Sequence, residues 1–347
     1  MAGVEIKKLL RYAFEKKASD LHVTVGTSPV FRIDGELRRL DISPLAPSDT
    51  EEMAKELIPQ HLYPSFLEKG ELDFSYGLPG ISRFRVNAYH QRGCIGLVAR
   101  VIPTGIPSLE ELGLPEVIRK LCHKPQGLLL VTGPTGSGKS TTLAAMIDYM
   151  NRTMRKHIVT LEDPIEYLHK HQLSMVNQRE IGFDTKDFAS ELRASLRQDP
   201  DVILVGEMRD LETISTAVTA AETGHLVLAT LHTTDAPKTI DRIIDVFPGD
   251  KQSQIRMQLS SVLVGIVSQR LFPKVGGGRA VATEILVHTH AVANLIRSEK
   301  NHQIKSLMQT GRELGMHTME SSVKELVDKG QITPEAAQHY LNERALE

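Results

Sequence analysis

The chain has 347 residues, which is too long for one ordinary hydrophobic core and predicts two or three domains at about 150 residues each. Its 41% hydrophobic and 24% charged residues are typical of a globular protein, and a formal net charge of −2 argues against a general attraction to nucleic acid. The two cysteines, Cys94 and Cys122, lie far apart and support neither a disulfide framework nor a tetracysteine zinc site.

The apolar segments give no sign of secretion or membrane insertion. Residues 1–20 are charged throughout and lack the apolar core of about 7 to 15 residues that a signal peptide needs. No apolar run approaches the ~18 residues of a membrane span. We therefore expect a cytoplasmic protein without membrane insertion and without direct contact with nucleic acid.

Residues 1–101 are predicted to form a small α+β domain. Apolar residues recur at helical spacing between positions 6 and 14, and alternating apolar and polar residues then indicate strands. These strands are predicted at residues 21–25, 30–37, 73–78, 82–91 and 94–102. Residues 102–115 carry repeated prolines and glycines between patterned segments, so we interpret them as an interdomain linker.

Residues 116–289 show a different pattern, in which runs of Val, Leu and Ile alternate with helical segments. This alternation is typical of a parallel sheet covered on both faces, and it predicts an α/β nucleotide-binding core. The apolar strands are predicted to begin at Gly127, His157, Asp201, His225 and Arg279. A helical apolar stripe is expected from Ile255 to Leu271, and residues 290–347 are predicted to form short helices.

The strongest motif is a complete P-loop between a predicted strand and a helix-forming run. Its glycines allow successive N–H groups to converge on phosphate oxygens at the positive end of a helix. Lys139 is expected to reach the β- and γ-phosphates of ATP or GTP, and Ser140 to ligate Mg²⁺. An ordinary Gly/Ser turn is the alternative. The predicted nucleotide-binding residues are Gly133, Pro134, Thr135, Gly136, Ser137, Gly138, Lys139, Ser140 and Thr141.

Glu207 is the first candidate for chemistry at the phosphates. Residues 201–207 predict an apolar strand ending in Gly206-Glu207, which places this carboxylate at the carboxyl edge of the sheet beside the P-loop. A carboxylate there can orient or deprotonate the attacking water, or hold Mg²⁺ together with Ser140. Many strands end in Gly-Glu, so this assignment depends on the P-loop that precedes it.

Acidic residues and histidines also follow predicted strands. Glu162, Asp163 and Glu166 crowd after the strand that follows the P-loop helix, where they can approach the metal or the water; a solvated acidic turn is the alternative. His225 and His232 bracket another strand and fall on its opposite faces, which argues against a two-histidine metal site. A histidine at a strand end can sense the γ-phosphate or a neighbouring subunit. Ordinary structural histidines are the alternative.

The order and spacing of these motifs resemble those of the secretion-type ATPases. The P-loop and residues 161–167 (LEDPIEY), 202–210 (VILVGEMRD) and 224–236 (GHLVLATLHTTDA) correspond to the Walker A, Asp box, Walker B and His box of that superfamily. The similarity covers essentially the whole length and is greatest to the type IV pilus retraction ATPases. Related assembly and secretion ATPases usually carry a long N-terminal extension and a tetracysteine insert, which this sequence lacks.

The resemblance implies a homo-hexamer whose subunits join an N-terminal PAS-like α+β domain to a RecA-like P-loop ATPase domain with a helical C-terminal region. ATP and Mg²⁺ are the implied cofactors, and an inner-membrane pilus platform protein is the implied partner, through which the ring is peripheral to that membrane. The implied catalytic set is Glu207 supported by Glu162 and Asp163, His225 and His232 as couplers to the subunit interface, and Arg83, Arg85 and Arg100 as phosphate-neutralising groups.

One segment departs from the pattern of the retraction ATPases. Residues 291–300 read AVANLIRSEK where an AIRNLIRE-like helix is common, with Ala293 in place of Arg and Ser298 in place of Glu. The sequence still predicts a Mg²⁺-dependent ATPase motor for pilus retraction and twitching motility. A DNA-dependent RecA-like translocase and a nucleotide-binding regulatory module with little turnover are the alternatives.

Overall fold

The computed structural model describes residues 5–33, 35–102 and 105–344, and the chain divides into two compact units, residues 1–105 and 106–347. Residues 103 and 104 of the expected linker lie outside the described residues, and residues 106–115 belong to the second unit. The predicted borders at 101, 115 and 289 stay predictions. Within the described residues, no helix is both long and apolar enough to cross a membrane.

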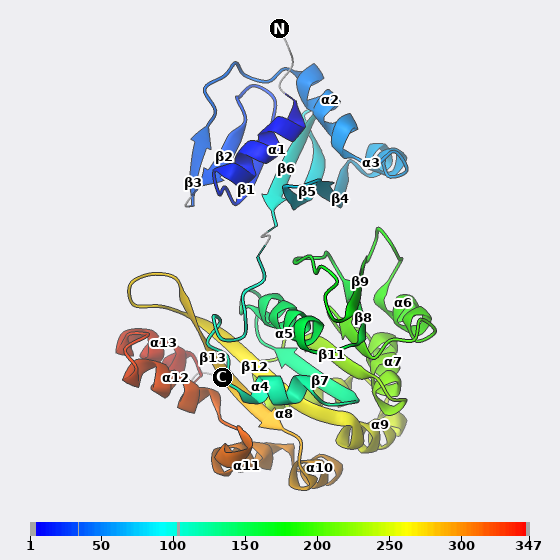
Figure 1. Ribbon diagram of the computed structural model, residues 1–347, viewed down its shortest axis with the longest axis vertical. Coiled ribbons are helices and arrows are strands. Elements are labelled where there is room, and N and C mark those ends of the chain that lie inside the picture. The colour runs from blue at the N-terminus through cyan, green and yellow to red at the C-terminus, as the bar shows by residue number, and fades with distance from the viewer. Residues whose placement is uncertain (1–4, 34, 103–104, 345–347) are drawn as a thin grey trace. The chain divides into compact units, whose positions relative to one another are not determined.

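The first unit is an antiparallel sheet of six strands in the order β3-β2-β1-β6-β5-β4, with its helices packed on one face (Figure 1). Alternate strand residues point to that face, where Leu21 and Phe84 form a core with Ile6 and Leu10 of the first helix. The elements are α1 (Ile6–Glu15), β1 (Asp20–Val23), β2 (Val30–Ile33), β3 (Glu36–Arg39), α2 (Pro47–Leu57), α3 (Tyr63–Lys69), β4 (Glu71–Leu78), β5 (Ser82–Gln91) and β6 (Cys94–Val101).

The second unit alternates strands and helices along most of its length, as the sequence predicts. Its elements are α4 (Val117–Cys122), β7 (Gly127–Thr132), α5 (Lys139–Thr153), β8 (His157–Glu162), β9 (Met175–Glu180), α6 (Phe188–Ser195), β10 (Val202–Val205), α7 (Leu211–Glu222), β11 (Leu226–Leu231), α8 (Ala236–Asp245), α9 (Gly249–Val262), β12 (Leu263–Pro273), β13 (Arg279–Val287), α10 (His290–Arg297), α11 (Ile304–Thr310), α12 (Met319–Asp328) and α13 (Pro334–Arg344). The predicted α/β organisation is confirmed.

Seven strands form one sheet in the order β13-β12-β7-β11-β10-β8-β9. Every neighbouring pair is parallel except β12 with β13, which is antiparallel. The carboxyl ends of parallel strands meet at one edge, and ligands of open α/β sheets bind in the crevice outside that edge. The P-loop follows β7, Glu207 follows β10 and His232 follows β11, so the topology brings all three to the same edge.

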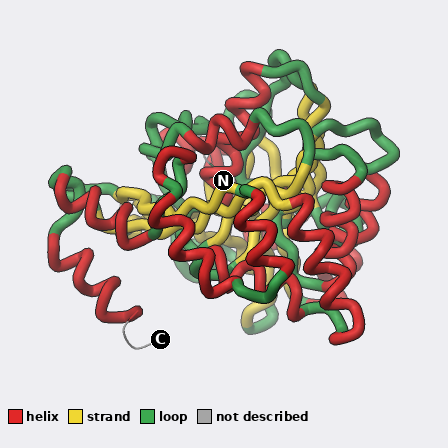
Figure 2. Tube along the Cα trace, turned by 90° about the horizontal axis from the view of Figure 1, so that it is seen from below, coloured by secondary structure: helices red, strands yellow, loops and turns green. Residues whose placement is uncertain are grey.

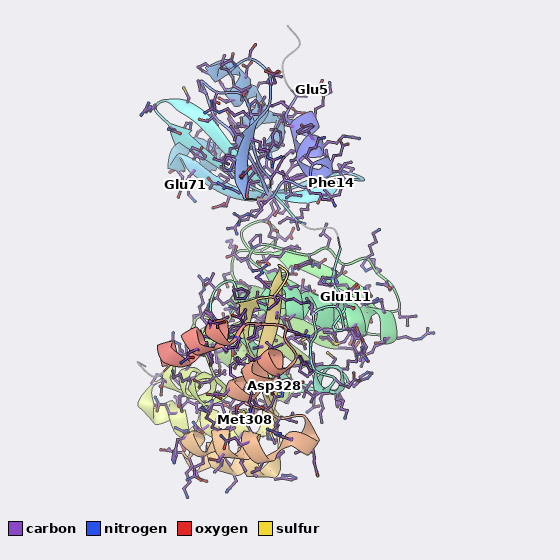
Figure 3. The ribbon with its side chains drawn as sticks, turned by 90° about the vertical axis from the view of Figure 1, so that its left-hand side faces the viewer. Glu5, Phe14, Glu71, Glu111, Met308 and Asp328 are labelled. Atoms are coloured by element: carbon purple, nitrogen blue, oxygen red, sulfur yellow. The ribbon has the colours of Figure 1, made fainter. Side chains whose placement is uncertain are left out.

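Two hydrophobic cores cover the two faces of this sheet. Leu128 and Leu130 of β7 face α7, α8 and α9, whereas Leu129 and Val131 face α4 and α5. Met308 of α11, labelled in Figure 3, extends the first of these cores into the C-terminal helices. The last helices, α12 and α13, lie beside β13 and lead to the C-terminus (Figures 1 and 2).

The expected helical stripe from Ile255 to Leu271 is wrong in its second half. Helix α9 ends at Val262, and the chain continues directly as β12 from Leu263. Spacing alone does not separate a buried strand from a buried helix, because a central strand is buried on both faces and most of its side chains are apolar. In β12 nearly all residues from Leu263 to Ser268 are fully buried, which leaves no polar face to reveal the period.

A buried carboxylate in β13 connects this sheet to two helices. Glu284 is 1% exposed, and its carboxylate accepts hydrogen bonds from the backbone N–H of Ala236 at 3.0 Å and of Met319 at 3.3 Å. These donors open α8 and α12, where the N–H groups of a first turn have no helical acceptor. One side chain thus joins the helix that follows the His232 loop to the C-terminal helical region.

Candidate active site

The P-loop is held between β7 and α5 in a backbone conformation that its sequence makes possible. Gly136 and Gly138 have φ angles of 79° and 88°, a region that residues with a side chain rarely adopt. Thr132 ends the strand and Lys139 begins the helix, so the loop occupies the predicted strand-to-helix turn. Among the described residues, no acceptor binds the backbone N–H groups of Gly136 and Gly138, which leaves both free for phosphate oxygens.

Lys139 is folded back onto the loop itself. Its Nζ donates hydrogen bonds to the carbonyl oxygens of Gly133 at 2.8 Å and Pro134 at 3.1 Å. Burial lowers the pKa of Lys139, and the charges of Glu207 and Glu166 oppose that effect only in part. Two backbone carbonyls therefore bind the ammonium group of Lys139, and phosphate oxygens of a nucleotide could take their place.

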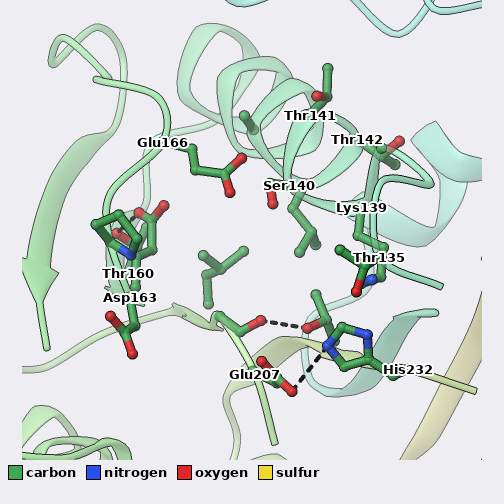
Figure 4. Close-up of a pocket in the computed structure, with 18 of the residues that line it drawn as sticks. Thr135, Lys139, Ser140, Thr141, Thr142, Thr160, Asp163, Glu166, Glu207 and His232 are labelled. Atoms are coloured by element: carbon green, nitrogen blue, oxygen red, sulfur yellow. Dashed lines mark hydrogen bonds and ion pairs between the residues drawn. The ribbon is translucent and has the colours of Figure 1, made fainter. Parts of the chain in front are cut away.

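A cavity of about 1230 Å³ lies at the carboxyl edge of the sheet and brings most of the predicted residues together (Figure 4). The cavity is lined by P-loop and α5 residues, by the turn after β8, and by side chains that follow β10 and β11. The predicted residues that line it are Thr135, Gly136, Gly138, Lys139, Ser140, Thr141, Glu162, Asp163, Glu207 and His232. Gly133, Pro134 and Ser137 are not in the lining, although the first two hold Lys139.

Glu207 is the carboxylate best placed for catalysis. Its side chain is 19% exposed, and its Oε1 pairs with Arg209 Nε at 2.6 Å and with His232 Nε2 at 3.1 Å. Burial acts to raise the pKa of Glu207, but the hydrogen bond from Arg209 and the charges of His232, Arg209 and Lys139 outweigh burial and lower it. The carboxylate is consequently kept ionised, as a base or a metal ligand must be.

Glu162 lies in a different environment. Its Oε1 accepts hydrogen bonds from Thr160 Oγ1 at 2.6 Å and from Gln178 Nε2 at 3.1 Å. Burial raises the pKa of Glu162, and these hydrogen bonds offset the effect only in part. Two carboxyl groups that line one cavity therefore have pKa values displaced in opposite directions, which is characteristic of sites that separate acid and base roles.

Two residues around Glu162 escaped the sequence analysis. Thr160 is two positions earlier in β8, on the same face of the strand, a spacing that could have indicated its contact with Glu162. Gln178 belongs to β9, an edge strand with a mostly polar sequence and no apolar run to signal it. Such a strand is visible only once its parallel pairing with β8 is known.

The structure does not bring His225 to the cavity. His225 precedes β11, whereas His232 follows it, so the two histidines lie at opposite ends of one strand. The Nδ1 atom of His225 lies 3.0 Å from the carbonyl oxygen of Ala220. A role for His225 at a subunit interface stays a prediction.

Arg83, Arg85 and Arg100 belong to the first unit and share one face of its sheet. Arg83 and Arg85 are two positions apart in β5 and so point to the same face, and Arg85 lies opposite Arg100 in the register of β5 with β6. Arg100 is committed to a partner, because its Nε donates to Asp20 Oδ1 at 2.9 Å. The proposed contact of these arginines with phosphate stays a prediction.

The fold and the cavity define a P-loop nucleotide hydrolase of the RecA-like class. The chain belongs to the Type II/IV secretion system protein family, whose model matches residues 4–341. It is 50% identical over 334 residues to the type IV pilus retraction ATPase PilT of Pseudomonas aeruginosa, covering 96% of this chain and 97% of that protein. It is 49% identical over 311 residues to a twitching motility protein of Neisseria gonorrhoeae, covering 89% of this chain and 83% of that protein.

A solved structure agrees with the fold. The crystal structure of the pilus retraction motor PilT with bound ADP is 51% identical to this chain and superposes with a TM-score of 0.92. The match covers 97% of this chain and 96% of that structure. The predicted resemblance to retraction ATPases and the predicted two-domain ATPase fold are therefore confirmed.

Proposed function

We propose that this protein is an ATPase motor that powers type IV pilus retraction, and with it twitching motility. The observation that carries the proposal is one cavity in which the P-loop, Glu207 and His232 meet, in a chain 50% identical over 96% of its length to a pilus retraction ATPase. The protein is an ATPase. Its mechanical output is depolymerisation of pilin.

The residues of the cavity have separate parts in hydrolysis. The free N–H groups of the P-loop bind the phosphates, and Lys139 leaves the carbonyls of Gly133 and Pro134 to neutralise phosphate charge. The lowered pKa of Glu207 keeps its carboxylate ionised, and this carboxylate orients the attacking water and accepts its proton. His232 contacts Glu207 and follows β11, so it is placed to transmit the state of the γ-phosphate.

Mg²⁺ is the cation that the donor set fits. Magnesium in nucleotide hydrolases is held by one or two protein oxygens together with substrate phosphates and waters. The hydroxyl of Ser140 and the carboxylate of Glu207 line the same cavity and are oxygen donors of this kind. Bound Mg²⁺ neutralises charge that develops on the phosphates.

We further propose a homo-hexamer that engages an inner-membrane pilus platform protein from the cytoplasm. Helix α10 supports this assignment, since Asn294 and Arg297 of the expected helix are present and exposed. Ala293 is buried at 3% exposure, so the absence of Arg at that position is accommodated by packing. Ser298 Oγ donates to the carbonyl oxygen of Asn294 and caps the helix end locally.

The proposal is tested by steady-state ATP hydrolysis of the purified protein with Mg²⁺, with assembly mass measured in the same samples. Hydrolysis by a hexamer, and restored twitching when the gene replaces that of a retraction motor, are the expected results. A matched control is Glu222→Gln, an exposed carboxylate of α7 outside the cavity, which should leave both unchanged. ATPase activity that requires DNA would favour the DNA-dependent translocase. Tight nucleotide binding without turnover would favour a regulatory module.

A further inference from the structure

Gln269 is a buried amide on β12 that touches the P-loop. It is 1% exposed, and its Nε2 donates a hydrogen bond to the carbonyl oxygen of Ser137 at 2.7 Å. A Cβ atom added to Gly138 would lie 3.2 Å from the same side-chain nitrogen. A Cβ atom added to Gly133 would lie 2.4 Å from the backbone carbonyl oxygen of Gln269. The loop therefore approaches β12 as closely as two glycines allow.

The hydrogen bond to Ser137 fixes the direction of a neighbouring donor. The carbonyl of Ser137 and the N–H of Gly138 belong to one planar trans peptide, so they point in opposite directions. Because Gln269 draws the carbonyl towards β12, the Gly138 N–H is turned away from that strand. Gly138 lines the nucleotide cavity, and its N–H has no acceptor among the described residues.

Stability alone does not account for an amide at this position. The Oε1 atom of Gln269 and the Oγ atom of Ser137 are both buried without a hydrogen-bond partner in the described part of the chain. A buried polar atom without a partner destabilises the folded state. A methionine would fill a similar volume and remove the unpaired Oε1, but it would leave the Ser137 carbonyl without its donor, so stability gives no clear preference for either side chain. The hydrogen bond from Nε2 to the Ser137 carbonyl, which orients the loop, explains the amide at this position.

We propose that Gln269 is a positioning residue that aims the Gly138 N–H at the phosphates of the bound nucleotide. The inference rests on the proposed function, because it assumes that the P-loop binds ATP and ADP. Gln269 acts through the Ser137 peptide, and its own side chain is also among the residues that line the cavity. It belongs to a strand that sequence reasoning took for a helix, so none of the four sequence motifs contains it.

The first test compares ADP affinity in Gln269→Met and wild type by isothermal titration calorimetry. Losing one oriented donor to a charged phosphate should weaken binding about tenfold. The melting temperature without nucleotide should fall, because the buried Ser137 carbonyl loses its donor, and the increase caused by ADP should shrink as well. In ATP hydrolysis, KM should rise with little change in kcat, since the contact is made in both ground and transition states.

A second variant separates orientation from simple packing. Gln269→Glu keeps the size of the side chain but presents an ionised acceptor to the Ser137 carbonyl at pH 8, so ADP binding should be weaker than in Gln269→Met. At lower pH the protonated carboxyl can donate again, and the affinity should recover towards wild type. A loss of ADP affinity that is the same at both pH values would argue for packing instead of the direction of this hydrogen bond.

The matched control is Ser268→Ala on the adjacent position of β12. Ser268 is fully buried and its Oγ lies 2.8 Å from Thr132 Oγ1, so this variant also removes a buried hydrogen bond beside the loop. Its ADP affinity should stay close to wild type. Wild-type ADP affinity in Gln269→Met, or in Gln269→Glu at pH 8, would overturn the role of Gln269. Absence of ADP binding by the wild-type protein would overturn the proposed function itself.

Discussion

The Nε2 atom of His232 lies 3.1 Å from Oε1 of Glu207, and Arg209 pairs with the same oxygen. The other oxygen, Oε2, makes no hydrogen bond or ion pair to protein within the described residues. One half of the carboxylate is thus fixed by two cationic or polar partners, while the other half is available to a water molecule. This arrangement defines what each neighbouring substitution should do.

Glu207→Gln should lower kcat for ATP hydrolysis by about 10²-fold or more, because an amide cannot accept the proton of the attacking water. Binding of ADP should be retained, since the P-loop contacts are untouched. Phosphate release and ADP calorimetry on the same preparation check both parts. Turnover equal to wild type would remove Glu207 from its assigned role.

Lys139→Ala should weaken ATP binding and hydrolysis together, because it removes a positive charge beside the phosphates. In the structure this ammonium group is bound by the carbonyl oxygens of Gly133 and Pro134, which phosphate oxygens would replace. The loss of a charge-assisted contact should raise the Kd for ADP about tenfold or more. Binding measured in parallel for Lys186→Ala, another lysine in the cavity lining, gives the contribution of general positive charge. Equal losses in the two variants would argue against a specific role for Lys139.

Arg209→Ala should shift the acidic limb of the activity profile to higher pH. Arg209 helps to hold the pKa of Glu207 low against the effect of burial, so its removal lets that pKa rise and protonates the base sooner as pH falls. Activity well above neutral pH should change less. The measurement is kcat/KM against pH, with Arg193→Ala on the surface ion pair to Glu212 as control. Superimposable acidic limbs would contradict the expectation.

Glu162→Gln should stabilise the folded protein, and increasingly so as pH rises. Burial raises the pKa of Glu162 in the folded state, so as pH rises the carboxyl group ionises in the unfolded chain before it ionises in the folded protein. The free energy of unfolding therefore falls as pH rises above the pKa of Glu162 in the unfolded chain. The amide removes this ionisation, and its oxygen can still accept from Thr160 and Gln178. Melting temperatures between pH 5 and 8.5 test this, and parallel curves for both proteins would refute it.

Arg100→Ala should destabilise the first unit by about 1 kcal/mol or less, because Arg100 itself is largely exposed to solvent. Burial acts to raise the pKa of Asp20, but hydrogen bonds from Ser19 and Arg100 outweigh it and lower that pKa. The stabilisation is therefore present above the unfolded pKa and lost as pH falls through the folded one. Denaturant unfolding followed from pH 7 into the acid range should show a difference between the two proteins that shrinks only as pH falls below the ordinary pKa of an aspartate.

Arg85→Ala is the comparison that separates stability from activity. Arg85 is exposed on the same sheet face and should leave unfolding unchanged. If these arginines neutralise phosphate charge, this variant should lower ATP hydrolysis nonetheless. A variant with full activity would argue against a role for Arg85 at the phosphates.

Most of the residues that the sequence analysis selected line one cavity, because they lie in short, local motifs. The P-loop needs glycines and a lysine at fixed spacing, and Glu207 and His232 each follow an apolar strand whose end sets their position. Glu162 was found, but its partner Gln178 was not, since β9 is recognisable only by pairing with β8.

Other features depend on contacts between distant segments. Gln269 lies 132 positions from the residue it binds, and no local pattern announces that contact. The step from α9 to β12 was missed because a doubly buried strand has no polar face. His225 and His232 were assigned one role because both lie in the segment that resembles the His box, although the length of one strand separates them.

The shared carboxylate of Glu284 has a mechanical consequence. Helix α12 and the start of α8 are fastened to the same side chain, and α8 directly follows the loop that bears His232. A displacement of α12 relative to α8 would lengthen one of these two hydrogen bonds. The hydrogen bond from Asn301 to Asp241 of α8 is a second link between the C-terminal region and this helix. A force on the C-terminal helices can therefore reach the His232 loop through buried contacts.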